Sequence, residues 1–251
     1  MPSRAARAVT CPAVNTLVIT GTGTGVGKTA VTAAIAALAR ADGRRVAVLK
    51  PAQTGVADDE RGDLSEVVRL AGELTTLELA RYPDPLSPDA AARQAALPPV
   101  RPPAVAAATT TLAQDHDLVL VEGAGGLLVR FDDAGGTLAD VAWALSAPVL
   151  VVARPGLGTL NETALTTEVL RRRGISRAGL VLGQWPEKPD LAARCNLADL
   201  AATAEVPLLG ALPDGAASLD RASFAEAASR ALSADFGGVF DALDFSASNP
   251  P

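Results

Sequence analysis

The sequence predicts an α/β fold, a doubly wound and mostly parallel sheet with helices on both faces. Three observations indicate this class. Short apolar runs alternate along the chain with segments of helical periodicity, which is the order expected of βαβ units. The apolar runs are continuous, as in parallel strands that are covered on both faces. A glycine-rich loop joins the first apolar run to the first helical segment.

The expected strands and helices follow one another in regular order. Apolar, β-prone runs predict strands at 17–20, 46–49, 118–121, 149–153, 180–182 and 208–212. Apolar residues spaced for one helix face predict helices at 27–41, 64–72, 104–114, 137–145, 159–173, 190–203 and 222–232. The proline-rich stretch 96–103 predicts a connector between helices. A chain of 251 residues can bury one large core, so we expect a single domain over 15–245 after a flexible extension at 1–14.

Composition argues against several classes of function. The net charge of -6 and the pI of about 4.9 disfavour a surface that neutralises nucleic-acid phosphates or anionic lipids. No apolar run reaches the roughly 18 residues of a membrane-spanning helix. Cys11 and Cys195 are too few for a disulfide framework. We therefore expect a cytoplasmic protein whose partners are small molecules or proteins, and neither nucleic acid nor membrane.

The segment VITGTGTGVGKTAV, residues 18–31, has the composition of a phosphate-binding loop. It runs from a strand through glycines into a helix, an order that aims backbone amides at phosphate oxygens. Three glycines permit positive φ and close backbone approach: Gly23, Gly25 and Gly27. Five residues lie between Gly21 and the Gly27-Lys28 pair, one more than in the usual P-loop, so the sequence predicts a variant P-loop. The fold expected around it is P-loop NTPase-like, a Rossmann-like arrangement of three layers. Lys28 would neutralise the β/γ-phosphates and Thr29 would bind Mg²⁺; a plain glycine-rich helix cap is the alternative.

The choice of lysine at two positions indicates a second anion contact. Among 22 lysines and arginines, only Lys28, Lys50 and Lys188 are lysines. Lys50 ends the second expected strand, so it should face the same crevice as the P-loop. A compact ammonium there suits a small anion better than a planar guanidinium. The alternative is a solvated lysine at a strand end.

Two carboxylates are candidates for the rest of a magnesium site. Mg²⁺ prefers octahedral oxygen coordination with few protein carboxylates. Glu122 ends the apolar strand DLVLVEGAGG and is followed by glycines that leave the backbone accessible. Asp63 precedes a helix, and on spacing alone it is as good a candidate for an N-cap as for a metal ligand.

Six motifs, in this order, resemble those of dethiobiotin synthetase. They are GTGTGVGKT, KPAQTG, GDL, VEGAGG, GTLNE and GQWP, and the resemblance covers about residues 16–220. It implies an ATP- and Mg²⁺-dependent ring closure that turns 7,8-diaminopelargonic acid and CO2 into dethiobiotin, ADP and phosphate during biotin synthesis. The implied route passes through a carbamate and a carbamic-phosphoric anhydride.

The same resemblance implies roles for individual residues. Those implied in catalysis are Lys50, Lys28 and Thr24. Those implied at the nucleotide are Gly23, Thr24, Gly25, Val26, Gly27, Lys28, Thr29, Glu122, Gly183, Gln184, Leu212, Pro213 and Asp214. Those implied at the substrate are Thr24, Lys50, Thr54, Gly158, Thr159, Leu160 and Asn161, of which 158–161 would reach the neighbouring subunit of a homodimer. Those implied at Mg²⁺ are Thr29, Asp63 and Glu122.

Two positions depart from the family pattern. Gly183 stands where many members place an asparagine that reads the adenine edge, and glycine has no side chain to donate or accept. We therefore expect weak discrimination among nucleoside triphosphates, with Gln184 or the backbone of 212–215 making part of the contact. Glu162 stands where histidine is common, and the sequence assigns no effect to it.

Three other functions were weighed. A cobyrinic-acid-type amidating synthetase needs a glutamine-hydrolysing domain, for which 251 residues leave no room. A partitioning-type ATPase usually carries a lysine early in the P-loop, and residues 22–24 supply none. A GTPase switch would need an Asn-Lys-x-Asp base-reading motif, which does not occur.

Overall fold

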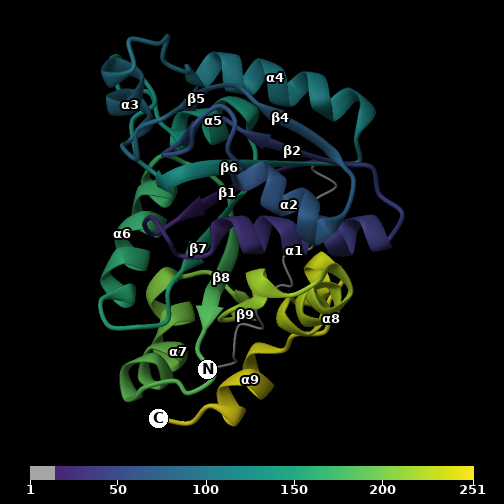
Figure 1. The fold of residues 1–251 in the computed structure, drawn as a ribbon. Coiled ribbons are helices and arrows are strands. Elements are labelled where there is room, and N and C mark those ends of the chain that lie inside the picture. Colours follow the sequence, from purple (N-terminus) through teal and green to yellow (C-terminus); the bar gives the residue numbers. More distant parts are fainter. Residues whose placement is uncertain (1–14) are drawn as a thin grey trace.

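A parallel sheet of seven strands forms the centre of the molecule in a computed structural model that describes residues 15–251 (Figure 1). The strand order is β4-β2-β6-β1-β7-β8-β9, and every pair of neighbours is parallel. These strands are β1 (Thr16–Gly21), β2 (Val46–Lys50), β4 (Thr75–Glu78), β6 (Leu118–Gly126), β7 (Val149–Ala153), β8 (Arg177–Trp185) and β9 (Leu208–Pro213). The α/β, doubly wound, three-layer prediction is confirmed.

Helices cover both faces of the sheet (Figure 1). They are α1 (Lys28–Ala41), α2 (Asp63–Ala71), α3 (Pro88–Gln94), α4 (Pro102–Asp115), α5 (Leu138–Leu145), α6 (Thr159–Arg172), α7 (Leu191–Ala204), α8 (Arg221–Ala231) and α9 (Ala242–Ser248). One core cluster joins a sheet face to α1, α2 and α8, and the other joins the opposite face to α4, α5, α6 and α7. Within β1, Leu17 and Ile19 enter the first cluster and Val18 the second, as the two-residue period of a strand requires.

The predicted strands and the longer predicted helices are all present, and the short elements were missed. Strand β4 has no continuous apolar run, because it lies at the sheet edge with two of its four residues exposed. A separate two-stranded sheet, β3 (Gln53–Thr54) with β5 (Arg81–Tyr82), also went unpredicted, as did α3 and α9. The stretch 96–103 connects α3 to α4, as predicted, and α4 begins at Pro102 because proline suits the first turn of a helix.

The order of the strands indicates which edge of the sheet binds a ligand. Strand β1 lies between β6 and β7, and the chain crosses from one side of β1 to the other between those two strands. In open α/β sheets, ligands bind outside the carboxyl ends of the strands at such a reversal. No helix within residues 15–251 is long and apolar enough to cross a membrane. The flexible extension predicted for 1–14 lies outside the described residues.

Candidate active site

The glycine loop after β1 adopts a conformation that depends on two of its glycines. Gly25 and Gly27 have φ of 72° and 92°, in the region that favours glycine. Gly27 is also the N-cap of α1, so the loop passes directly into the helix. Gly23 also permits positive φ but does not adopt it. Gly23 instead presents its carbonyl oxygen to the ammonium of Lys28, which donates to it over 2.9 Å.

Gly183 lies against the backbone of the glycine loop. A Cβ atom at position 183 would lie 2.0 Å from the carbonyl oxygen of Val26, and one at Gly27 would lie 2.6 Å from the carbonyl oxygen of Gly183. Both distances are far inside van der Waals contact, so β8 and the loop approach this closely only because both residues are glycines. Gly183 therefore has a packing role that the sequence did not reveal.

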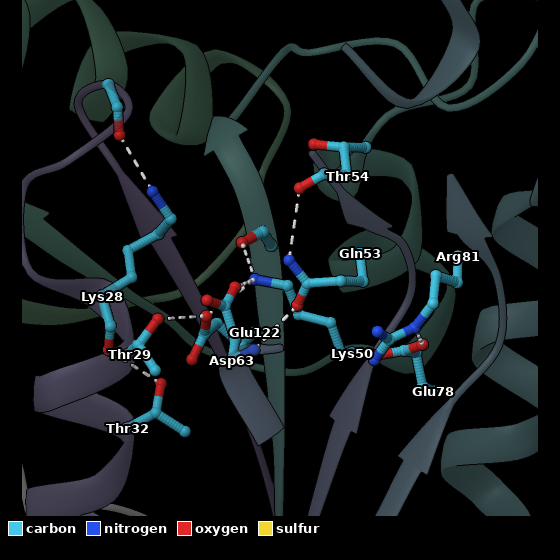
Figure 2. Close-up of polar contacts among 12 residues, drawn as sticks. Lys28, Thr29, Thr32, Lys50, Gln53, Thr54, Asp63, Glu78, Arg81 and Glu122 are labelled. Atoms are coloured by element: carbon cyan, nitrogen blue, oxygen red, sulfur yellow. Dashed lines mark hydrogen bonds and ion pairs between the residues drawn. The ribbon is translucent and has the colours of Figure 1, made fainter. Parts of the chain in front are cut away.

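The end of β2 and the middle of β6 bring two opposite charges together. The ammonium of Lys50 lies 2.8 Å from Oε1 of Glu122 and 3.3 Å from the carbonyl oxygen of Gly123. Leu49 of β2 pairs with Val121 of β6 in the parallel ladder. The residues that follow them, Lys50 and Glu122, therefore lie side by side on the two strands. Figure 2 shows both side chains converging there. Lys50 is buried, which excludes the solvated strand-end alternative.

Two helix N-termini complete this cluster. Asp63, the first residue of α2, places Oδ2 at 2.5 Å from the ammonium of Lys50. Thr29, in the first turn of α1, donates its hydroxyl to Oε1 of Glu122 over 3.0 Å. The N-cap of α2 is Gly62, so the N-cap alternative for Asp63 is wrong. The side chain of Asp63 is 36% exposed, against 1% for Glu122.

The charges of this cluster act on each other. Burial and the nearby charge of Lys50 lower the pKa of Lys28 to about 8, although Glu122 and Asp63 pull it back upward. Burial by itself would lower the pKa of Lys50 too, but its ion pairs with Glu122 and Asp63 outweigh burial and raise that pKa above the ordinary value. Lys50 therefore keeps its charge, whereas Lys28 holds its proton less firmly.

A cavity of about 780 Å³ opens over the cluster. The predicted site residues that line it are Thr24, Gly25, Gly27, Lys28, Thr29, Lys50, Thr54, Asp63, Glu122, Gly183, Gln184 and Pro213. Lys28 and Lys50 thus open into one space, as the predicted fold required. Gly23 and Val26 belong to the glycine loop but do not line the cavity, the side chain of Leu212 is buried in the core, and Asp214 is exposed beside it.

The segment 158–161 lies at the start of α6 and does not line this cavity. Its glycine, Gly158, has φ of 95° and forms the N-cap of α6. Glu162, one turn into α6, forms an ion pair with Arg154 at the end of β7. A contact of 158–161 with substrate in a second subunit stays a prediction.

Sequence reasoning missed part of the cavity wall. The unpredicted lining residues include Gln53, the segment 85–88, Val129 and Ala217. Prolines in RYPDPLSPD do mark the segment 85–88 as a turn, but nothing in their spacing points to the P-loop. Arg69 of α2 donates to the carbonyl oxygens of Ala217 and Leu219, so α2 also supports the opposite end of the cavity.

The oxygen atoms at the cluster suit a hard divalent cation. Thr29, Glu122 and Asp63 offer a hydroxyl and two carboxylates, the ligand types that Mg²⁺ accepts in proteins. Across the described part of the chain, no group of three or more His, Cys, Asp or Glu side chains could hold a metal by itself. Mg²⁺ in nucleotide sites uses one or two carboxylates together with phosphate oxygens. The residues present therefore fit Mg²⁺ bound together with a nucleotide.

The fold and the strand, glycine loop and helix define a P-loop NTPase-type domain. Residues 15–220 match the family model of an AAA domain. Among solved structures, the septum site-determining protein MinD of Pyrococcus horikoshii, complexed with Mg-ADP, superposes with a TM-score of 0.51 at 20% identity, covering 85% of this chain and 86% of that one. The MinC:MinD complex of Aquifex aeolicus gives a TM-score of 0.51 at 14% identity, covering 80% and 81%. These likenesses show the fold alone.

Sequence relatives identify the family within that class. An ATP-dependent dethiobiotin synthetase of Streptomyces avermitilis is 64% identical over 95% of this chain and 100% of its own length. That of Saccharopolyspora erythraea is 65% identical over 90% and 98%. The chain belongs to the dethiobiotin synthetase family and is an ATP-dependent ligase. The predicted resemblance is confirmed, and the three other functions weighed from the sequence are set aside.

Proposed function

We propose that this enzyme makes dethiobiotin from 7,8-diaminopelargonic acid, CO2 and a nucleoside triphosphate, through a carbamate and a carbamic-phosphoric anhydride. One observation carries the proposal: two ammonium groups, two carboxylates and a hydroxyl converge in one cavity beside a P-loop. Phosphoryl transfer needs little beyond the positioning of two anions and the neutralisation of their charge. This cavity supplies both.

The reaction needs three bond-forming steps. One amine nitrogen of the substrate adds to CO2 and loses a proton, which gives a carbamate. A carbamate oxygen attacks the γ-phosphorus of ATP, and ADP leaves. The second amine then attacks the carbamoyl carbon and loses a proton, the carbon–oxygen bond to phosphate breaks, and inorganic phosphate leaves with the ureido ring closed.

The two lysines would hold the two reacting anions. Lys28 projects toward the loop carbonyl of Gly23 (Figure 2), and its ammonium would neutralise the β/γ-phosphates. Lys50 is fixed by buried Glu122 and by the more exposed Asp63. Because the contact with Asp63 is the exposed one, it is the contact that a carbamate oxygen can replace. Thr24 and Thr54 line the same space and offer hydroxyls to the substrate amines or carbamate.

Thr29, Asp63 and Glu122 would hold Mg²⁺. When bound, Mg²⁺ supplies positive charge to the phosphate oxygens. The role of the protein groups is orientation: Glu122 accepts the hydroxyl of Thr29 and so fixes that oxygen toward the cavity. The ladder of β6 with β1 and β2 fixes Glu122 in turn.

We also propose weak selection of the nucleotide base. Gly183 offers no side chain at the cavity, and its contact with Val26 leaves no space for one. Gln184 and Pro213 are exposed at this end, so a base meets one flexible amide and backbone groups. Turnover with ATP, CTP and GTP should agree within about ten-fold, since residues 15–251 place no buried hydrogen-bonding side chain beside Gly183 and Pro213 in the cavity. A strong preference for adenine would contradict this.

A homodimer would complete the substrate site. The segment 158–161 lies outside the cavity of its own chain. Trp143 of α5, Leu157 just before α6 and Leu165 of α6 are 69%, 86% and 57% exposed, large apolar side chains that a second subunit can cover. Light scattering should give twice the monomer mass, and Trp143→Arg should shift it toward the monomer. A wild-type monomer at assay concentration would contradict the proposal.

An isotope experiment tests the reaction itself. The enzyme is mixed briefly with diaminopelargonate, Mg-ATP and ¹⁸O-labelled bicarbonate, before the label exchanges with water. Mass spectrometry should detect dethiobiotin together with phosphate that carries one ¹⁸O, because the carbamate oxygen that attacks phosphorus stays on phosphate. Lys50→Ala should make neither product while still binding ADP. Dethiobiotin formed with unlabelled phosphate would refute the anhydride.

A further inference from the structure

Helix α2 begins without a capping side chain of its own. Its N-cap, Gly62, has none, and Asp63 is the first helical residue, so the Asp63 amide has no carbonyl partner within the helix. Gln53, ten residues earlier on β3, supplies the missing acceptor. The Asp63 amide donates to Oε1 of Gln53 over 2.9 Å. Gln53 is 5% exposed, so this bond is shielded from solvent.

Both the backbone and the side-chain amide of Gln53 are hydrogen-bonded to neighbouring groups. Its backbone amide donates to the carbonyl oxygen of Ala80 over 2.9 Å, and β3 pairs with β5 so that Gln53 lies opposite Arg81. Its Nε2 donates to the carbonyl oxygen of Thr54 over 3.3 Å. With Nε2 engaged there, Oε1 faces the Asp63 amide, as Figure 2 shows.

Arg81 holds the loop that leads into α2. Its guanidinium donates to the carbonyl oxygens of Ala57 and Glu60, both over 2.9 Å, and forms an ion pair with Glu78. A Cβ atom at Gly62 would lie 2.8 Å from Oε1 of Gln53 and 3.0 Å from Nη2 of Arg81. At Gly62 the backbone of the loop therefore contacts the side chains of Gln53 and Arg81 directly, with no space for a Cβ atom.

The two carboxylates near Lys50 are held by different means. Glu122 lies within a central strand and pairs with Ile19 of β1, and its neighbour Val121 also pairs with Leu49 of β2. Asp63 lies at the junction of an exposed loop and a helix, where ends fray unless they are capped. The hydrogen bond that the Asp63 amide donates to Gln53 therefore holds the first residue of α2, and with it the backbone that carries the Asp63 carboxylate.

We propose that Gln53 is a positioning residue, which holds Asp63 in place for the Mg²⁺-nucleotide complex. The inference rests on the proposed magnesium role of Asp63. It assigns to the fourth residue of KPAQTG a function in metal binding, exerted through the backbone of α2, with no direct contact to the cation.

Binding of ADP, with Mg²⁺ and in EDTA, tests the proposal by calorimetry. Gln53→Met keeps the length of the side chain and removes the acceptor, whereas Gly62→Ala pushes Oε1 away sterically at a φ of -97° that alanine accepts. In both variants the gain in affinity that Mg²⁺ confers should fall about ten-fold, the usual effect of losing a residue that orients a metal ligand. The affinity for ADP in EDTA should change less than the gain from Mg²⁺ does. Gln114→Met, on the exposed face of α4, is the matched control.

Hydrogen exchange gives a readout that does not involve the metal. The Asp63 amide should exchange faster in Gln53→Met and Gly62→Ala than in wild type or Gln114→Met. Unchanged exchange in both would overturn the proposal, because the amide would then not depend on Gln53.

The variant Asp63→Asn distinguishes a failure of the positioning role of Gln53 from a failure of the proposed magnesium role of Asp63. If it reduces the gain from Mg²⁺ while Gln53→Met and Gly62→Ala do not, the positioning role is wrong and the proposed function stands. If Asp63→Asn leaves the gain intact, the magnesium role of Asp63 is wrong and the positioning proposal falls with it. Reduction in all three variants supports both.

Discussion

Replacing Lys50 with methionine tests whether the charges at the sheet edge form one buried unit. Methionine matches the volume of lysine and removes the charge. The side chain of Lys50 is 4% exposed and that of Glu122 is 1% exposed, whereas that of Asp63 is 36% exposed. The substitution therefore leaves Glu122 buried as an anion, with the hydroxyl of Thr29 as its remaining donor.

The expected loss of stability follows from this difference in burial. Removing one partner of a buried ion pair destabilises a protein by about 3–5 kcal/mol, because the other charge stays buried without compensation. The pair with partly exposed Asp63 contributes only about 0–1 kcal/mol. We expect the free energy of unfolding to fall by about 3 kcal/mol, which for this size of chain lowers Tm by roughly 6–12 °C.

A double-mutant cycle assigns the loss to one partner. Urea unfolding at pH 7, followed by tryptophan fluorescence, should show that Glu122→Gln in the Lys50→Met background restores most of the lost stability. Asp63→Asn in the same background should restore less than about 1 kcal/mol. Lys188→Met, at the exposed third lysine, is the control.

The prediction of a stabilising buried pair between Lys50 and Glu122 would be refuted if Lys50→Met were as stable as wild type at pH 7. Equal recovery of stability from Glu122→Gln and Asp63→Asn would refute it as well.

Three further outcomes are expected. Because the pKa of Lys28 is lowered to about 8, calorimetric affinity for ADP in EDTA should fall as pH rises above 8, and Lys28→Arg should remove this dependence; a flat wild-type profile would contradict it. Gly183→Ala should destabilise the protein by about 1–3 kcal/mol in urea, since its Cβ meets a carbonyl oxygen of the P-loop. Arg69→Ala should raise KM for ATP and leave KM for the diamine unchanged, because Arg69 holds the carbonyl oxygens of Ala217 and Leu219. Equal changes in the two KM values would contradict this role of Arg69.

Where local chemistry was distinctive, sequence alone predicted the fold and much of the site. Continuous apolar runs identified the central strands, because a strand covered on both faces consists mainly of apolar residues. The edge strand β4 and helix α9 lack that constraint, since solvent covers much of β4 and no residue of α9 is buried. Their sequences therefore carried no periodic signal.

The candidate site divides in the same way. Lys28 and Thr29 were recognisable because the glycine loop and the helix start are adjacent in sequence. Lys50 and Glu122 were recognisable because each stands at the end of an apolar run, although β6 continues past Glu122 to Gly126. Gln53 and the segment 85–88 carried no comparable signal, because their approach to the cavity depends on the small β3–β5 sheet.

The sequence by itself determined the family, the parallel α/β fold and the identity of the charged groups, because those follow from residue type and spacing along the chain. Only the tertiary structure decided which groups meet. It placed Asp63 on Lys50 instead of at a helix cap, and Gly183 against Val26. The physical reason is that these contacts join segments far apart in the chain, and their distances are fixed by strand register and loop packing, which residue spacing does not encode.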